Sequence, residues 1–326
     1  RAALADGEAE IVTGALGFDT GGPAALLAPE QWGHEPVGAV GQQPERTADS
    51  LTLTPPAVHR ERVRAALAAI DAGRAEKIVL ARSLRAELAQ PVTPEQLIAD
   101  FTATASASTV FAAPLDPAPG HAGHWLIGAS PELLLRKRGT VVTCEPYAGS
   151  AARQALPEAD LAVGQGLLAS EKDLREHAFV VDDLRARLTP LCTEVQAPHV
   201  PVLRSTAQLW HLSTPIRAVL TDPAVTALDL AALLSPTPAV CGTPTAAAAA
   251  EIARIEGPRE FYAGTVGWCD AAGDGDWLVS IRCLELCADR RTVHAWAGGG
   301  IVAGSDPDAE VAETDTKFGT VLAALG

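Results

Sequence analysis

The feature that most constrains this 326-residue sequence is a run of three glycines, Gly298–Gly300, followed closely by a strong helix signal. Pro307 stands where the first residue of a helix often stands, so we expect a helix from there toward the C-terminus. On that helix Glu310, Glu313 and Lys317 are spaced so that they share one face. Two carboxylates and an ammonium beside bare backbone favour a hard cation together with an anion, and magnesium is the first candidate.

A second acidic cluster lies on a long helical pattern that we predict over residues 158–189. Asp173 and Glu176 are three residues apart and therefore share a face. One magnesium ion between the two helices, with carboxylates from each, explains both clusters. Acidic stripes are more often only solvated helix faces, so the residues alone leave both interpretations open.

The order of the predicted elements indicates an α+β fold. Other helices are expected at 57–72, from Pro94 to about residue 105, and at 224–234. Strands are expected at 77–85, 107–113, 124–129, 132–136, 140–145, 263–269, 277–286 and 292–297. Because runs of strands are interspersed with helices and do not alternate strictly with them, we expect large antiparallel sheets in one domain spanning residues 1–326.

The formal net charge of −15 disfavours partners that are polyanions. We therefore expect no nonspecific binding to nucleic acid or to an anionic membrane surface, because both would be repelled. An anionic ligand needs a local reversal of sign, from a metal ion or from a few well-placed Arg and Lys side chains. No run of roughly 18 apolar residues occurs, so no membrane span is expected.

The six cysteines form no C-x-x-C pair, and the chain is far longer than a disulfide-stapled domain. We therefore expect reduced thiols and a cytoplasmic protein. The chain begins at Arg1 and contains no methionine, from which we expect that the natural start is missing.

Three motifs resemble known sites but fit a structural role better. Gly164-x-Gly166 lies inside a helical pattern instead of at a strand-to-helix turn, which argues against a nucleotide fingerprint. Three aspartates between 270 and 276 lack the spacing of a calcium loop and predict a hairpin turn. His121-x-x-His124 has no cysteine or glutamate nearby in the sequence, so we predict a solvated loop there.

A set of sequence blocks in a fixed order carries a more specific signal than any of these motifs. The blocks are Gly128-Ala-Ser-Pro-Glu-Leu-Leu-Leu135, Ala148-Gly-Ser-Ala-Ala-Arg-Gln154, Leu168-Ala-Ser-Glu-Lys-Asp173 with Glu176-His177, Leu209-Trp-His-Leu212, Pro236-Thr-Pro238, Gly264-Thr-Val-Gly-Trp-Cys-Asp270, Ile281-Arg-Cys283, and Gly298-Gly-Gly-Ile-Val302 with Glu313-Thr314. Together they resemble the chorismate-utilising enzymes that make isochorismate, salicylate, anthranilate and aminodeoxychorismate. Within that family, Ser130-Pro-Glu132, Trp210-His211 and Gly267-Trp-Cys-Asp270 are most similar to isochorismate synthases of siderophore pathways.

The resemblance implies a fold of two packed, mainly antiparallel sheets flanked by helices, and a bound magnesium ion. By position, Glu176 and Glu313 would bind Mg²⁺, with Asp173 and Glu310 nearby through water. The ion would neutralise the ring carboxylate of chorismate.

The resemblance also implies a set of substrate-binding residues. A dianionic substrate in an acidic protein requires a dication, an arginine and unhindered backbone N–H groups. The matching residues are Gly149 and Ser150 at the ring carboxylate, Arg282, Tyr262, Gly298 and Gly300 at the enolpyruvyl carboxylate, and His211 at the ring. We place Lys317, which shares a helix face with Glu313, in the same set.

The implied chemistry is addition of water at ring carbon 2 with loss of hydroxide from carbon 4. The positions that match the base and the acid of the family are Lys77 and Glu132. The lysine must give up its proton near neutral pH and the glutamate must keep its own, and burial favours both. We therefore predict a Mg²⁺-dependent isochorismate synthase that acts on chorismate as a monomer.

Alternatives to this prediction stay open. Salicylate synthases share nearly every block and go on to eliminate pyruvate. A catalytically silent chorismate-binding protein would keep the fold, although the presence of Lys77, Glu132, Glu176 and Glu313 counts against it. A magnesium-dependent phosphohydrolase fits the acidic helices, but the sequence has no phosphate-binding loop.

Overall fold

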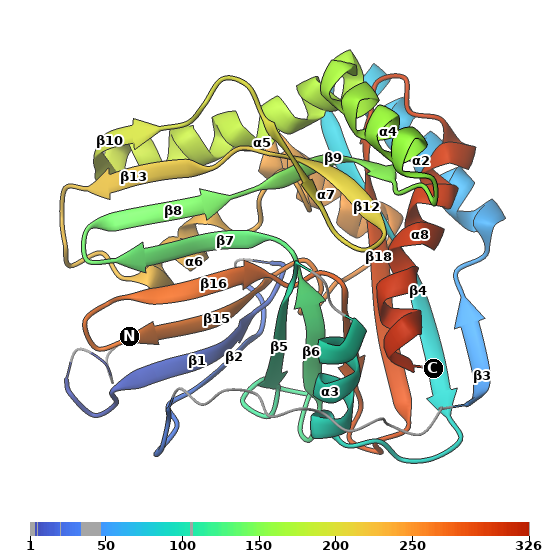
Figure 1. The fold of residues 1–326 in the computed structure, drawn as a ribbon. Coiled ribbons are helices and arrows are strands. Elements are labelled where there is room, and N and C mark those ends of the chain that lie inside the picture. The colour runs from blue at the N-terminus through green and yellow to red at the C-terminus, as the bar shows by residue number, and fades with distance from the viewer. Residues whose placement is uncertain (1–3, 5, 20, 34–46, 105–106, 326) are drawn as a thin grey trace.

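The computed structural model describes residues 4, 6–19, 21–33, 47–104 and 107–325. They form two large sheets, a small third sheet and helices packed on them (Figure 1). The strands of the two large sheets run in nearly perpendicular directions in that view. The paired strands of the described residues are antiparallel. The predicted α+β class with large antiparallel sheets is therefore confirmed.

The first large sheet has eight strands in the order β10-β13-β8-β7-β16-β15-β1-β2. Its strands are β1 (Ile11–Leu16), β2 (Ala24–Leu27), β7 (Leu133–Arg138), β8 (Val141–Glu145), β10 (Cys192–Gln196), β13 (Ile216–Leu220), β15 (Thr265–Asp270) and β16 (Gly275–Val279). Alternation along the strands produces its buried face. In β16, for example, Trp277 and Val279 are buried and Leu278 between them is partly exposed.

The second large sheet contains β14-β4-β18-β17-β6-β5 in that order, and β3 also pairs with β4. Its strands are β3 (Ala48–Leu53), β4 (Lys77–Leu88), β5 (Thr109–Pro114), β6 (Trp125–Ser130), β14 (Gly242–Thr243), β17 (Cys283–Leu286) and β18 (Thr292–Val302). The long pairing of β4 with β18 places Gly300 opposite Val79 and Val302 opposite Lys77. The glycine run is thus part of a strand beside the predicted base.

The predicted strand 277–286 is wrong as a single element, because its two halves belong to different sheets. Residues 275–279 form β16 in the first sheet, and residues 283–286 form β17 in the second. Between them the chain crosses from the first sheet to the second. Arg282 lies in this crossing and has a φ of 51°, a backbone conformation that residues other than glycine rarely adopt. The crossing places Arg282 at the junction of the two sheets.

A third sheet, which the sequence did not predict, has the order β11-β12-β9. Its strands are β9 (Tyr147–Ala152), β11 (Val202–Ser205) and β12 (Leu209–Ser213). In the pairing of β9 with β12, Ser150 faces His211 and Ala148 faces Leu212, so Gly149 is an extra, bulged residue. Its φ of 76° suits glycine, and such a bulge changes the direction of the side chains that follow it.

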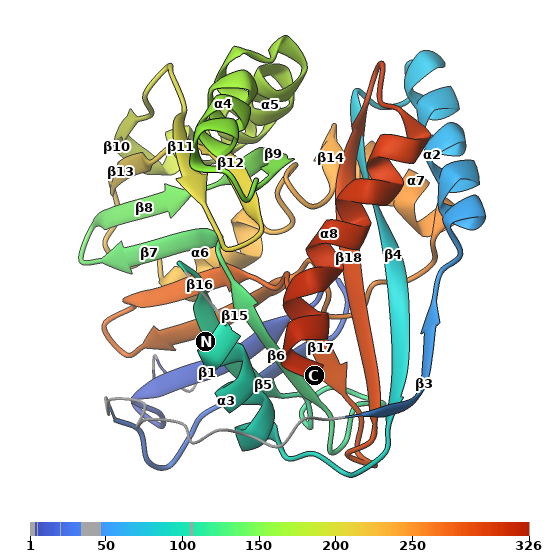
Figure 2. The same cartoon turned by 45° about the vertical axis from the view of Figure 1, so that its right-hand side comes forward.

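The helices pack on both large sheets. The single helix predicted at 158–189 is two helices in the structure. Ser170 ends the first helix and caps the second, where its hydroxyl oxygen accepts a hydrogen bond from the Asp173 amide. The helices are α2 (Pro56–Asp71), α3 (Pro94–Thr104), α4 (Pro157–Ala169), α5 (Glu171–Leu188), α6 (Ala227–Leu234), α7 (Thr245–Ile255) and α8 (Pro307–Leu325), with a 3-10 turn at Thr189–Leu191. Helix α8 packs against β18, α2 and α3, and Figure 2 shows it lying across β18.

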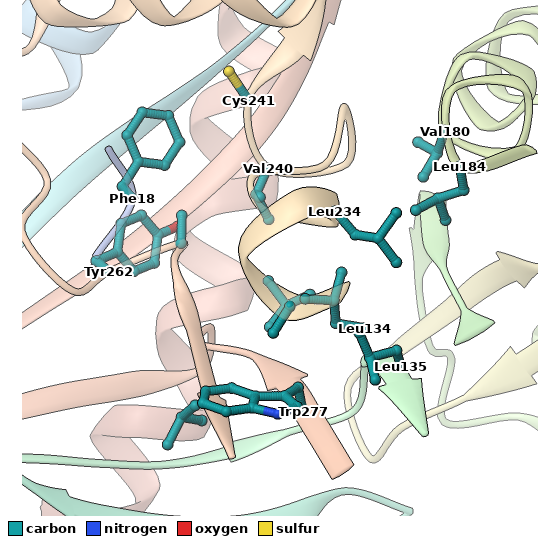
Figure 3. Close-up of a cluster of buried hydrophobic side chains, with 14 of the residues drawn as sticks. Phe18, Leu134, Leu135, Val180, Leu184, Leu234, Val240, Cys241, Tyr262 and Trp277 are labelled. Carbon is teal, nitrogen blue, oxygen red and sulfur yellow. The ribbon is translucent and has the colours of Figure 1, made fainter. Parts of the chain in front are cut away.

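The core that holds the first sheet to its helices is apolar and well filled. Leu134 and Leu135 of β7, Leu234 of α6, and Val180 and Leu184 of α5 belong to one buried cluster (Figure 3). Each of these side chains is less than 10% exposed. Burying a leucine or valine contributes about 1.5–3 kcal/mol, so this cluster fixes α5 against the sheet.

Two expectations about the whole chain concern membrane-spanning helices and the state of the cysteines. Among the described helices, none is long and apolar enough to cross a bilayer. All six cysteines are free thiols, four of them buried, as expected of reduced cysteines.

Candidate active site

Most of the predicted site residues line one cavity, where the two large sheets, the third sheet, α5 and α8 meet. The cavity wall also includes Tyr147 and Trp296, which the sequence did not single out. The predicted residues in the wall are Glu132, Gly149, Ser150, Glu176, His211, Tyr262, Arg282, Gly298, Gly300, Glu313 and Lys317. Of the other predicted residues, Lys77, Asp173 and Glu310 do not line the cavity and lie behind its wall.

Lys77 is the first residue of β4 and its side chain is fully buried. Its ammonium lies 2.9 Å from Glu176 Oε1, but the contact lacks the geometry of a hydrogen bond. A Cβ atom on Gly300 would lie only 2.9 Å from Lys77 Cε. Because Gly300 lines the cavity and has no side chain, the end of the lysine approaches the cavity wall at this point.

Glu132 lies between β6 and β7, lines the cavity and is only 2% exposed. Burial raises its pKa from 4.5 to about 7, although the Tyr147 backbone amide and the charges of Lys77, Lys317 and Arg282 act in the opposite direction. A substantial fraction of Glu132 is therefore protonated at neutral pH. This is the state that the predicted acid requires.

Glu313 lines the same cavity, but its pKa is shifted in the opposite direction. Its Oε1 accepts a hydrogen bond from Ser150 Oγ at 2.8 Å and lies 2.6 Å from Lys317 Nζ. Burial favours the protonated form of Glu313, but the Lys317 charge and these hydrogen bonds outweigh it and lower its pKa. Lys317 also donates to the Gly298 carbonyl oxygen at 2.7 Å, which ties α8 to β18.

Each of the three predicted glutamate ligands has a lysine beside it. Besides the pairs of Glu176 with Lys77 and of Glu313 with Lys317, Lys172 Nζ lies 3.5 Å from Glu310. Lys172 was missed, although it stands one residue before Asp173 and four before Glu176. Its position on the predicted acidic face was the signal that could have found it.

The carboxylates of this group lie close enough to influence one another. The pKa of Glu310 is raised by burial and then by the Glu313 charge, and that of Asp173 is raised by burial and then by the charges of Glu176 and Glu313. Glu310 Oε2 is buried and has no hydrogen-bond partner. These residues therefore form a local concentration of negative charge that three lysines only partly balance.

Bare backbone lines the space between the carboxylates. A Cβ on Gly300 would lie 2.2 Å from Glu176 Oε1, and a Cβ on Gly299 would lie 2.9 Å from Glu310 Oε2. Any side chain at these two positions would collide with a carboxylate. Close approach therefore requires glycine at 299 and 300, whereas a Cβ at Gly149 or Gly298 would meet its nearest atom at 3.1 Å.

The donor set fits a magnesium ion that keeps some of its water. All candidate ligands are carboxylate oxygens, which Mg²⁺ prefers, and one of them is a buried oxygen without a partner. They do not form a closed cage, because no three of them bring ligand atoms within 4.8 Å of one another. Mg²⁺ in proteins usually binds one or two carboxylates and retains several waters, so an open arrangement suits it.

The cationic side of the cavity is formed by Arg282, which is 7% exposed. Burial lowers the pKa of its guanidinium, and Tyr262, Glu313 and Glu132 act in the opposite direction. Its Nη1 is 3.4 Å from Thr320 Oγ1. Nearby, Tyr262 stacks on Trp296 with ring centroids 5.6 Å apart. An arginine between aromatic and backbone walls is suited to a planar carboxylate.

His211 forms another part of the wall and is not a satisfied core histidine. It stacks on Tyr147 with ring centroids 5.3 Å apart, and its Nε2 is buried without a hydrogen-bond partner. Burial lowers its pKa well below 6.5, as do the charges of Arg282 and Lys317. A neutral imidazole with one free nitrogen is therefore available to a ligand.

Fold and cavity together define an enzyme for a small anionic substrate, and the family comparison specifies its class. Residues 33–326 match the model of the family described as chorismate binding enzyme, and the chain belongs to that family. The resemblance drawn from the sequence blocks is thereby confirmed.

Named relatives agree with this assignment. The chain is 46% identical to the putative isochorismate synthase MenF of Mycobacterium tuberculosis, over all of this chain and 89% of the relative. It is 42% identical to the isochorismate synthase DhbC of Bacillus subtilis, over 97% of this chain and 81% of the relative. Among solved structures, the putative 2,3-dihydroxybenzoate-specific isochorismate synthase DhbC of Bacillus anthracis matches with a TM-score of 0.89 and 38% identity, covering 100% of this chain and 86% of that one.

Proposed function

We propose that this protein is an isochorismate synthase, which converts chorismate to isochorismate with Mg²⁺ as cofactor. The observation that carries the proposal is a buried acid and a buried lysine at one cavity. Glu132 has a pKa of about 7, and the end of Lys77 lies behind the bare backbone of Gly300. The relatives named as isochorismate synthases support it.

Substrate binding uses both charged sides of the cavity. Chorismate carries two carboxylates, and the enolpyruvyl carboxylate would lie against Arg282, which lines the cavity together with Tyr262 and Gly298. The ring carboxylate would lie toward Ser150, another residue of the cavity wall. Lys317, held by Glu313 and Gly298, adds a second positive charge to the wall.

Water addition and hydroxide loss require two proton transfers. Lys77 accepts a proton from the water whose oxygen bonds to ring carbon 2, and the ring double bonds shift. The bond from carbon 4 to its hydroxyl oxygen breaks as Glu132 donates its proton, so water leaves. One water enters and one leaves, which makes the net reaction an isomerisation. Each general acid or base role typically contributes about 10²–10⁴ in rate.

Glu176 and Glu313 would hold the magnesium ion, with Glu310 and Asp173 contributing through water. When bound, the ion would neutralise the ring carboxylate of the substrate. The contacts around the candidate ligands orient their carboxylates: Ser150 and Lys317 fix Glu313, and Ser170 fixes the first turn of α5.

A product assay tests reaction and metal together. Purified protein is incubated with chorismate, with Mg²⁺ or with EDTA, and the products are separated by chromatography. We expect isochorismate only with Mg²⁺, and the absence of isochorismate in both samples would overturn the proposal. Coupling to lactate dehydrogenase measures pyruvate in parallel. Release of pyruvate in proportion to turnover would instead establish the salicylate synthase alternative.

We further propose that the protein acts in the cytoplasm as a monomer and that its product enters siderophore or related aromatic metabolite synthesis. The motifs most similar to siderophore-pathway enzymes and the free cysteines support this. Light scattering coupled to size exclusion measures the oligomeric state, and a mass of twice 33.7 kDa would contradict the monomer.

A further inference from the structure

A histidine and glutamate cluster lies outside the catalytic cavity. His121 and His124 are in the turn between β5 and β6, and Glu285 is on β17. Glu285 Oε1 lies 2.6 Å from His124 Nδ1 and 3.1 Å from His121 Nδ1. All three ligand atoms lie within 4.8 Å of one another, which no other group of histidine, cysteine or acidic residues achieves in the described part of the chain. None of the three lines the catalytic cavity.

Residues 121–124 form a loop, as predicted, but His121 and His124 are only partly exposed and have a glutamate partner. The sequence offered no nearby glutamate, because Glu285 is 161 residues beyond His124 and reaches it only through the pairing of β17 with β6. The histidine side chains are 13% and 22% exposed and that of Glu285 is 9% exposed. A loop histidine that only faced solvent would not be covered to this extent.

We propose that His121, His124 and Glu285 form a binding site for a divalent transition metal of the Zn²⁺ class. Two imidazole nitrogens and one carboxylate oxygen are a set that such ions take in proteins, with a fourth position left to water. Metal to ligand distances of about 2.0–2.2 Å imply ligand atoms roughly 3.3 Å apart in a tetrahedron. The observed separations of 2.6 and 3.1 Å are shorter than this, so Glu285 would move outward when an ion binds.

The surroundings hold the ligands in place. The His121 ring packs edge to face on Phe261 with ring centroids 5.2 Å apart, and its other nitrogen, Nε2, lies 3.8 Å from Glu260 Oε2, beyond hydrogen-bond distance. The turn is held by its own backbone, since the His124 amide donates to the His121 carbonyl at 2.9 Å and the Leu115 amide donates to the His124 carbonyl at 2.9 Å. Glu285 is fixed in the middle of a strand paired on both sides.

The site joins two segments that lead to the catalytic cavity. Strand β6 begins at Trp125, directly after His124, and runs to the segment that carries Glu132. Strand β17 begins at Cys283, directly after Arg282. A bound ion would fasten the far ends of these paired strands, so its expected effect is on stability. It is independent of the magnesium site, whose ligands are all oxygens on α5 and α8.

Cobalt binding tests the proposal. Protein stripped with a chelator and returned to excess Mg²⁺ is titrated with Co²⁺, whose visible absorption is intense when imidazoles hold it in a four-coordinate site and weak in an all-oxygen octahedral site. We expect one equivalent to produce the intense spectrum, Zn²⁺ to displace it, and Zn²⁺ to raise the melting temperature by a few degrees. A weak octahedral spectrum, or no binding, would overturn the proposal.

Matched variants assign the ligands. H124N and E285Q should each weaken Co²⁺ binding by more than about tenfold and remove the Zn²⁺ effect on melting, whereas H199N, at an exposed histidine outside the cluster, should change neither. H121N is a third variant, and circular dichroism identifies which variants are folded. Unchanged Co²⁺ binding in any folded cluster variant contradicts the site, as does equal loss in H199N.

Discussion

Two glutamates of one cavity, Glu132 and Glu313, differ both in burial and in their partners, since Glu132 is 2% exposed and the Glu313 side chain 28%. Glu132 has no cation within hydrogen-bonding distance, and burial raises its pKa to about 7. Glu313 has Lys317 and Ser150 on one oxygen, and its pKa is lowered. The same side chain is thus kept as an acid on one wall and as an anion on the other. Burial and the placement of partners, and not residue type, set the direction of each pKa shift.

Removing the proton of Glu132 should produce the largest effect. In E132Q the amide keeps the shape of the side chain but cannot protonate the leaving oxygen. We expect kcat for isochorismate formation to fall about 10²–10⁴-fold, with little change in the Mg²⁺ requirement. E158Q, at an exposed glutamate of α4, is the control and should match the parent. Activity within threefold of the parent in E132Q would remove Glu132 from catalysis.

Neutralising Glu313 should affect the metal instead of the acid. E313Q takes a charged partner from Lys317 and Ser150, and hydrogen bonds to charged groups contribute about 1.5–3 kcal/mol. We expect the half-saturating Mg²⁺ concentration to rise roughly 10–100-fold, measured from initial rates. D308N, at an exposed aspartate of the same helix, is the control. If E313Q requires no more Mg²⁺ than D308N does, Glu313 is not a ligand.

Adding a side chain at Gly300 should displace both Glu176 and Lys77, which lie next to this glycine. The Cβ of G300A would lie 2.2 Å from Glu176 Oε1 and 2.9 Å from Lys77 Cε, so both side chains must move. Overpacking of this kind costs about 1–3 kcal/mol, and we expect lower melting temperature together with a rise in the Mg²⁺ requirement. G319A, where a Cβ meets nothing within 4 Å, is the control and should be neutral or stabilising. Equal behaviour of G300A and G319A would show that the close approach is unimportant.

The smallest expected effect is on the pH dependence of stability. The folded-state pKa of Glu132 is raised from 4.5 to about 7, so its contribution to stability is fully present below about pH 4.5 and is lost as the pH rises through about 7. Between pH 6 and 8 this amounts to about 1.4 kcal/mol. Thermal melting of the parent and E132Q at both pH values measures it. The parent should lose more stability than E132Q, and parallel losses would mean that Glu132 ionises normally.

Local sequence patterns predicted the helix faces well. Glu313 and Lys317 were expected on one face of a helix starting at Pro307, and they are in contact there. The strand from Lys77 and the stop of the preceding helix before Gly73 are also as predicted. Such features depend on residues within about one turn or one strand, where spacing alone decides the geometry.

Features that depend on distant partners were missed or mistaken. The separate strands on either side of Arg282 and the third sheet each require knowledge of which strand pairs with which. The pairing of Glu285 with His121 and His124 was invisible for the same reason. Strand pairing is set by burial of whole faces, which no local window contains.

The sequence by itself determined which side chains are available, their spacing along α8 and β4, and, through its ordered blocks, the family. Only the tertiary structure decided their chemical states. Glu132 and Glu313 are both glutamates, yet one has a raised pKa and the other a lowered one. The free energy of a charge depends on water removed by the surrounding fold and on hydrogen-bond donors from other segments, such as Ser150 beside Glu313, and both arise only when the chain is packed.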